Sequence, residues 1–235
     1  MQEKPIKILF INGSPNQEGN TATVMKWVEE GILSSGAESE WLQVTDLDVH
    51  YCKGCNMCLK MGVCIQVDDM VIVKEKIKLS DGVVVGSPVY EGYPTAQLKT
   101  IQDRVALQCL YLGLFDDKWA VGVSTSGVAP TGKTAKLSAE TFGKLAGTVS
   151  AKTASLKAGY QRPDKKRQCD IYDKARKSGE RLVKNIKQNP LLSTGRLKSV
   201  WIDFLRKHFL KKMIVKNPDL FSGVIEEWKK RGWLD

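Results

Sequence analysis

The sequence contains no apolar run long enough to cross a membrane, and its start shows no apolar segment followed by a small-residue cleavage site. We therefore expect no membrane span and a cytoplasmic location, where clustered thiols stay reduced and available to metal. With 235 residues, 42% of them hydrophobic and 26% charged, the chain is typical of a soluble globular protein with a substantial core.

Positive charge is scarce in the first two thirds of the chain. Residues 1–150 hold 14 Lys and Arg against 17 Asp and Glu, whereas residues 151–235 hold 22 against nine. The formal net charge of +10 therefore comes from the last third. Such a tail can bind nucleic acid, a membrane surface or an acidic protein. A solvated helical face explains it more simply, so we do not expect a nucleic-acid partner.

The sequence lacks two widely separated C-x2-C pairs, but it has one dense group of cysteines. Four of the six cysteines fall within thirteen residues, at Cys52, Cys55, Cys58 and Cys64. Two C-x2-C steps put three thiolates on consecutive tight turns, and a five-residue gap with Gly62 lets the chain return a fourth. An all-sulfur donor set at this spacing favours a 4Fe-4S cluster over structural zinc, free thiols or a disulfide. Cys109 and Cys169 are isolated, and we expect both to be ordinary buried thiols.

Apolar runs of strand length alternate with helical patterns along the chain. We predict strands at 6–11, 40–44, 82–86, 119–123 and 149–156, and helices that start at 19–21 or span 68–79, 95–107 and 170–188. Repeats of this kind form a doubly wound parallel sheet. The predicted fold class is α/β, with a flavodoxin-like five-stranded sheet in the order 2-1-3-4-5. This domain occupies residues 1–189.

Three loops follow predicted strands one, three and four, at the edge where open α/β sheets bind ligands. The first runs from Asn12 to Thr21 and leads into a helix, so its backbone N–H groups and the positive helix end form a phosphate cradle. The second, 87–94, has two prolines, a glycine and two tyrosines, and a flat ring could lie against it. The third begins at Ser124.

Residues 127–134 match the P-loop pattern G-x4-G-K-T. The match follows the fourth strand instead of the first, and no convincing apolar strand ending in a magnesium-binding Asp comes after it. We therefore interpret this segment as a loop that contacts a ligand at the same sheet edge, not as a nucleoside triphosphate site.

Residues 190–235 lie outside the strand and helix repeat and form a basic, tryptophan-containing extension. We predict a helix at 196–213 and another that starts at 217–219 and is stopped by Gly232. Their many aromatic residues should pack against the body or a sister subunit. Before the 68–79 helix, Asp68 and Asp69 should act as N-terminal caps, not as ligands.

Several segments together resemble the iron-sulfur flavoprotein branch of the NAD(P)H-dependent FMN reductases, over roughly residues 5 to 190. They are 8–15, 19–21, the cysteine run followed by Asp68-Asp69-Met70, 86–90, 97–99 and 103–104. The joint occurrence of these motifs is more specific than any one of them. Asn16 is a departure, because members of the family often carry Arg there.

The resemblance implies two cofactors and an oligomer. The FMN phosphate would lie on Ser14, Asn16, Gly19, Asn20 and Thr21. The isoalloxazine would lie beside Ser87, Pro88, Val89, Tyr90, Glu91 and Gly92, with further contacts from Ser124, Thr125, Ser126 and Gly127. A 4Fe-4S cluster would be held by Cys52, Cys55, Cys58 and Cys64. Assembly into a homodimer or homotetramer is also implied.

The function that we predict is that of an FMN-dependent oxidoreductase and electron-transfer protein. Electrons would move among an NAD(P)H or ferredoxin donor, FMN, the cysteine-bound cluster and a small-molecule acceptor. Because flavin redox chemistry belongs to the cofactor, we assign no catalytic acid or base. The alternatives are a plain NAD(P)H:FMN or quinone reductase with idle or zinc-bound cysteines, and a regulatory or nucleic-acid-binding protein that uses the basic tail.

Overall fold

The computed structural model describes residues 4–127, 131–152, 165–189 and 194–234. In this part of the chain, five parallel strands form one sheet in the order β2-β1-β3-β4-β5, which confirms the predicted topology. The elements are β1 (Lys7–Asn12), α1 (Asn20–Leu33), β2 (Glu38–Gln43), η1 (Val44–Asp46), α2 (Met57–Met61), α3 (Met70–Leu79), β3 (Gly82–Pro88), α4 (Ala96–Leu112), β4 (Trp119–Ser126), α5 (Gly132–Glu140), β5 (Lys144–Lys152), α6 (Lys165–Gln188), α7 (Thr194–Leu205), the π-helical turn η3 (Arg206–Leu210), α8 (Lys211–Lys216) and α9 (Ser222–Lys230).

The central strands are buried on both faces, and this is why their apolar runs are continuous. Every residue of β4 is buried, as are the first six residues of β3. The edge strands are less buried: β2 has one buried residue, and β5 mixes buried with partly and fully exposed residues. The predicted start of the fifth strand at residue 149 is wrong, because β5 begins at Lys144; residues 153–156 lie outside the described residues.

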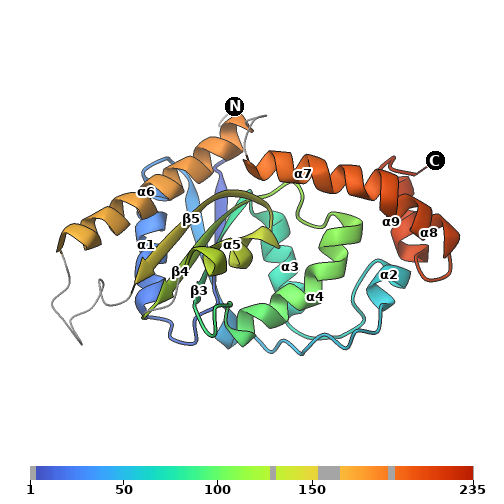
Figure 1. Ribbon diagram of the computed structural model, residues 1–235, viewed down its shortest axis with the longest axis horizontal. Coiled ribbons are helices and arrows are strands. Elements are labelled where there is room, and N and C mark those ends of the chain that lie inside the picture. The colour runs from blue at the N-terminus through green and yellow to red at the C-terminus, as the bar shows by residue number, and fades with distance from the viewer. Residues whose placement is uncertain (1–3, 128–130, 153–164, 190–193, 235) are drawn as a thin grey trace.

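Helices cover both faces of the sheet (Figure 1). Helices α1 and α6 pack on one face around Phe10 and Val121, and α3, α4 and α5 pack on the other around Ile11 and Val85. The carboxyl ends of β1, β3 and β4 therefore open at one edge, where the connecting loops meet. Within the described residues, each helix is too short or too polar to cross a bilayer.

Helices α1 and α6 touch along their backbones at two glycines. A Cβ on Gly31 would lie 2.0 Å from the carbonyl oxygen of Arg176, and a Cβ on Gly179 would lie 2.2 Å from that of Val28. Both separations are far below van der Waals contact. The two helices can approach this closely only because neither glycine carries a side chain.

The C-terminal helices pack against α4 and supply hydrogen-bond donors for its last turn, at the right of Figure 1. The Arg206 guanidinium donates to the carbonyl oxygens of Cys109 and Leu110, each at 2.6 Å. The Trp228 indole N–H donates to the carbonyl oxygen of Tyr111, also at 2.6 Å. The last four carbonyls of a helix have no partner within the helix. The extension therefore completes the C-terminal end of α4.

The predictions for this extension are only partly confirmed. Trp228 on α9 is buried, but Trp201, Phe204 and Phe209 are between 48% and 63% exposed. These three side chains lie on α7 and η3, the segment whose buried residue Arg206 contacts α4. The predicted helix start at 217–219 is wrong, because α9 begins at Ser222; the Asn217 amide instead donates to the carbonyl oxygen of Met213, near the end of α8.

Replacing Gly179 by Ala should lower the free energy of unfolding by about 1–3 kcal/mol, because the added methyl group forces α1 and α6 apart. Urea unfolding measures the change. The control is Gly132→Ala, whose new Cβ would meet no atom closer than 4.0 Å. This control should stay within about 0.5 kcal/mol of the original protein. An equal loss in the two variants would contradict the close approach of the helices.

Candidate functional site

The loops after β1, β3 and β4 are tied to one another by hydrogen bonds at the carboxyl edge of the sheet. The Thr95 hydroxyl donates to the carbonyl oxygen of Gly13 at 2.6 Å, and the Thr95 N–H donates to the Ser87 hydroxyl at 3.0 Å. The hydroxyls of Thr21, at the start of α1, and Thr125, at the end of β4, lie 2.8 Å apart. The structure thus brings the carboxyl ends of β1, β3 and β4 to one place.

The first loop presents an uncapped helix N-terminus. Asn16 accepts the N–H of Glu18 with its side-chain oxygen at 3.1 Å, which shapes a tight turn before α1. Gly19 precedes α1 and supplies no side-chain cap. The buried oxygen of the Asn20 amide has no protein partner, but it is an acceptor and does not pair with a phosphate oxygen. The groups that fit the oxygens of a phosphate are the unpaired backbone N–H groups and the positive helix end.

Several hydroxyls predicted to contact the ligand are already used inside the protein. Ser87 donates to the carbonyl oxygen of Pro88 at 2.8 Å, and Ser124 donates to that of Thr131 at 2.5 Å. Because β4 extends to Ser126, residues 124–126 are buried strand and not loop, contrary to our expectation. The predicted residues that are at least partly exposed are Asn16, Asn20, Pro88, Val89, Tyr90, Glu91, Gly92 and Gly127.

The loop after β3 forms a tight turn closed by paired backbone hydrogen bonds between Tyr90 and Tyr93, at 3.0 and 2.9 Å. Glu91 and Gly92 both have positive φ, +50° and +80°, which gives the turn its left-handed backbone. Both tyrosines are about half exposed. Two aromatic side chains on a stiff turn therefore stand beside the phosphate cradle.

Side chains from the P-loop match support this turn. The Thr134 hydroxyl donates to the carbonyl oxygen of Gly92 at 2.9 Å, and the Lys133 ammonium lies 4.7 Å from the centre of the Tyr93 ring. In a P-loop these two side chains would serve the phosphates and magnesium. The contacts favour the interpretation of this segment as a support for the ligand loop; residues 128–130 lie outside the described residues.

The cysteine loop occupies the crossover between β2 and α3, as predicted. Its tight turns rest on left-handed residues at Gly54, Asn56 and Gly62, with φ of +63°, +57° and +74°. The pKa of the Cys58 thiol is raised by burial and then by the charges of its three cysteine neighbours, of which Cys64 is the strongest. Among the described residues the four thiols are not drawn together into a ready metal-binding group.

Arg104 of α4 reaches under the cysteine loop. Its guanidinium forms an ion pair with Asp68, and neither side chain is exposed to solvent. It also donates to the carbonyl oxygen of His50 at 2.8 Å and to the Cys64 sulfur at 3.5 Å. Burial raises the pKa of Cys64, but the N–H of Gln66 and the Arg104 charge outweigh it, so the pKa is lowered.

Sequence reasoning did not assign this role to Arg104, which entered only as part of a family motif. A long polar side chain at a buried helical position was the available clue, since Gln108 follows one turn later on the same stripe of α4. The capping expectation was half right. Asp68 accepts the N–H of Met70 at 3.1 Å, but Asp69 caps nothing and accepts the N–H of Asp48 at 2.8 Å.

Two helices hold the cysteine loop by its backbone. Gln108 of α4 donates to the carbonyl oxygen of Gly62 at 3.0 Å, and Ser222 of α9 donates to that of Lys60 at 2.9 Å. Gly223 approaches so closely that an added Cβ would lie 2.2 Å from the Gly62 nitrogen. The C-terminal extension therefore supports the cysteine loop as well as α4.

A cavity of about 340 Å³ lies between the segment after β2 and the start of α4. Tyr51, the residue before Cys52, lines one side, and Ala96 and Gln97 line another. None of the four clustered cysteines is among its lining residues.

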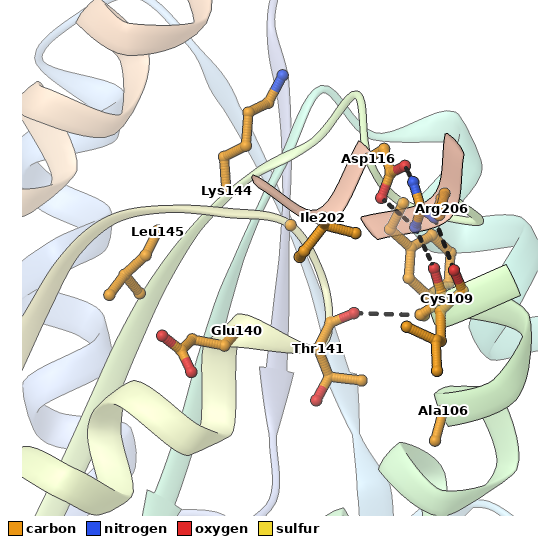
Figure 2. A pocket seen from close by; sticks show the side chains of 12 residues that line it. Ala106, Cys109, Asp116, Glu140, Thr141, Lys144, Leu145, Ile202 and Arg206 are labelled. Atoms are coloured by element: carbon orange, nitrogen blue, oxygen red, sulfur yellow. Dashed lines mark hydrogen bonds and ion pairs between the residues drawn. The ribbon is translucent and has the colours of Figure 1, made fainter. Parts of the chain in front are cut away.

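A second cavity, of about 270 Å³, lies near the amino ends of β4 and β5, away from the carboxyl edge of the sheet (Figure 2). Figure 2 shows Arg206 paired with Asp116 and the Cys109 thiol donating to the carbonyl oxygen of Thr141, at 3.4 Å. These polar groups bind one another and leave an apolar lining. We do not assign the redox site here.

The sheet order and the ligand edge define the class of flavodoxin-like α/β proteins. RosB, solved with bound 8-demethyl-8-formylriboflavin-5'-phosphate, superimposes with a TM-score of 0.58 over 83% of this chain and 85% of its own, at 14% identity. A likeness at this identity shows the fold alone. Within that class, the model of the NADPH-dependent FMN reductases matches residues 6–161, so the chain belongs to this family.

Two curated relatives carry the name iron-sulfur flavoprotein. The protein from Methanocaldococcus jannaschii is 40% identical over 99 residues, which cover 42% of this chain and 51% of the relative. The protein from Clostridioides difficile is 28% identical over 229 residues, which cover 96% of this chain and 98% of the relative. The chain spans about half the length of the first curated relatives that it matches.

The two isolated cysteines should differ in reactivity. Burial, with a smaller effect of Asp116, raises the pKa of Cys109 to about 12. Cys169 is exposed on α6, which corrects our expectation of a buried thiol. Cys109 is therefore mostly un-ionised at pH 9, and its side chain is only partly exposed. Iodoacetamide should therefore alkylate Cys169 and spare Cys109 until urea unfolds the protein, as mass spectrometry would show; equal labelling of the native protein would refute the buried environment.

Proposed function

We propose that this protein is an FMN-dependent oxidoreductase that also carries a 4Fe-4S cluster on Cys52, Cys55, Cys58 and Cys64. The observation that carries the proposal is a juxtaposition. A helix N-terminus without a side-chain cap stands at the carboxyl edge of the sheet, and a loop that carries four free thiols follows the edge strand β2. Membership in the FMN reductase family and the names of the curated relatives support both cofactors.

The FMN phosphate binds at the first turn of α1, with Ser14, Asn16 and Asn20 around it. The donors in this loop are neutral, so the positive end of α1 offsets most of the phosphate charge. The isoalloxazine lies against the turn formed by residues 90–93, whose half-exposed tyrosines are the nearest aromatic surfaces. The protein thereby orients the flavin and leaves the redox chemistry to it.

The donor set fits an iron-sulfur cluster, because all four candidate ligands are thiols. Because the four thiols do not form a ready metal-binding group among the described residues, the loop has to rearrange to hold the cluster. When bound, FMN exchanges a hydride with a nicotinamide, and the cluster passes single electrons. Arg104 places a fixed positive charge beside Cys64.

The protein acts as a homodimer or homotetramer in the cytoplasm, with NAD(P)H or ferredoxin as donor and a small molecule as acceptor. Exposed apolar side chains support assembly. Tyr51 and Val67, which flank the loop that carries the four cysteines, are 78% and 96% exposed. Trp201 and Phe209 add a second exposed apolar surface on the C-terminal helices.

The phosphate cradle can be tested by Asn20→Asp. A carboxylate in the first turn of α1 should preserve or raise the stability of the flavin-free protein, but it should repel the phosphate. We expect the dissociation constant for FMN to rise at least about tenfold, equivalent to about 1.4 kcal/mol. Flavin fluorescence measures it. Gln188→Glu, which adds the same charge at the end of α6, is the control and should bind FMN normally.

The cluster can be tested on protein purified without oxygen. The wild type should contain iron, sulfide and FMN, and one-electron reduction should give a paramagnetic signal. Cys58→Ser removes one of the four ligands, so iron and sulfide should be lost while FMN stays. Cys109→Ser, outside the loop, should leave the iron content unchanged. A wild type with FMN but without iron or sulfide would support the plain reductase instead.

A further inference from the structure

The feature that goes beyond the proposed function is the charge beneath the cysteine loop. The Arg104 guanidinium is fully buried and bridges three segments that are distant in sequence. Besides the ion pair, a second hydrogen bond of 3.0 Å runs to the other carboxylate oxygen of Asp68, so the pair is two-pronged. The remaining donors reach the carbonyl oxygen of His50 and the sulfur of Cys64, while the Nε–H has no protein partner.

The ion pair between Arg104 and Asp68 alone would hold these segments together, without the contact between Arg104 and the Cys64 sulfur. A pair of opposite buried charges satisfies itself, and an additional contact to sulfur brings little when the sulfur is a neutral thiol, which is a weak acceptor. The contact gains strength when the sulfur is a thiolate bound to iron, because hydrogen bonds with a charged partner are roughly twice as strong. The geometry therefore points to a charged state of the loop that the thiols alone do not supply.

We propose that Arg104 positions Cys64 as a ligand and raises the reduction potential of the cluster, and that Asp68 moderates this effect. The inference rests on the proposed function, because it needs the cluster. Hydrogen bonds to the sulfurs and nearby charges are the terms that set iron-sulfur potentials. Here both terms come from one residue of α4.

The charge balance gives the sign. Four thiolates around an oxidised 4Fe-4S core of charge +2 would carry a net charge of −2, and addition of one electron would make it −3. No bond forms or breaks in this step. A buried cation that touches one ligand stabilises the more negative state more strongly, so it favours reduction. The carboxylate of Asp68 acts in the opposite direction, because it lies against the same guanidinium.

Two single substitutions separate this role from a structural clamp. Arg104→Gln removes the cation, keeps a donor amide and should shift the potential of the cluster to a more negative value. Asp68→Asn removes the anion, keeps a similar shape and should shift it to a more positive value. The double variant should fall between them. Lys99→Gln removes the same charge from an exposed position on α4 and should leave the potential unchanged.

The measurement is a redox titration followed by electron paramagnetic resonance, with iron and sulfide content determined on each sample. Opposite shifts in the two single variants are the expected result. Shifts of the same sign, or potentials equal to that of Lys99→Gln, would overturn the inference. If the Arg104→Gln protein contains no cluster, the reduction potential of the Asp68→Asn protein alone tests the inference. A loaded wild type with both single variants empty also overturns the tuning role, whereas a wild type without iron defeats the proposed function instead.

Discussion

The buried ion pair between Arg104 and Asp68 fixes the geometry of the cysteine edge of the molecule. Removing one partner of such a pair costs about 3–5 kcal/mol, because the other charge stays buried without compensation. The pair joins α4, which belongs to the core of the sheet, to the end of a long crossover that has little core of its own. Gln108 adds a second link from the same helix. Helix α4 is therefore the element on which the cysteine loop is mounted.

The two candidate sites differ in how far the protein builds them in advance. At the carboxyl edge of the sheet, hydrogen bonds among Gly13, Ser87, Thr95, Thr21 and Thr125 join the ends of β1, β3 and β4 without any ligand. The cysteine loop has its backbone anchored but its thiols apart. A rigid cradle suits a cofactor that binds by shape and hydrogen bonds. An adjustable set of thiols suits an inorganic group whose bonds to sulfur supply the final geometry.

Features that local sequence patterns encode could be predicted, and contacts between residues far apart in the sequence could not. Strands β1, β3 and β4 were recognisable because burial on both faces requires continuous apolar runs, whereas the half-exposed edge strands were misplaced at their ends. The cysteine spacing and the loop before α1 were also visible locally. The contacts of Arg104 and Arg206 were not, because their partners lie 36 to 97 residues away and no local pattern encodes them. The apolar run of β4 ends at Val123, so the sequence did not reveal that the strand continues to Ser126 and buries Ser124.

The completion of α4 by distant donors has a consequence for synthesis on the ribosome. Trp228 lies 117 residues after Tyr111, and Arg206 lies 97 residues after Cys109. At about 5–20 residues per second, the end of α4 remains uncapped for several seconds after it emerges. During that interval the cysteine loop also lacks its contacts with α9. A nascent chain therefore carries its four clustered cysteines on a loosely held loop, and the mature arrangement is available only after translation has passed residue 228.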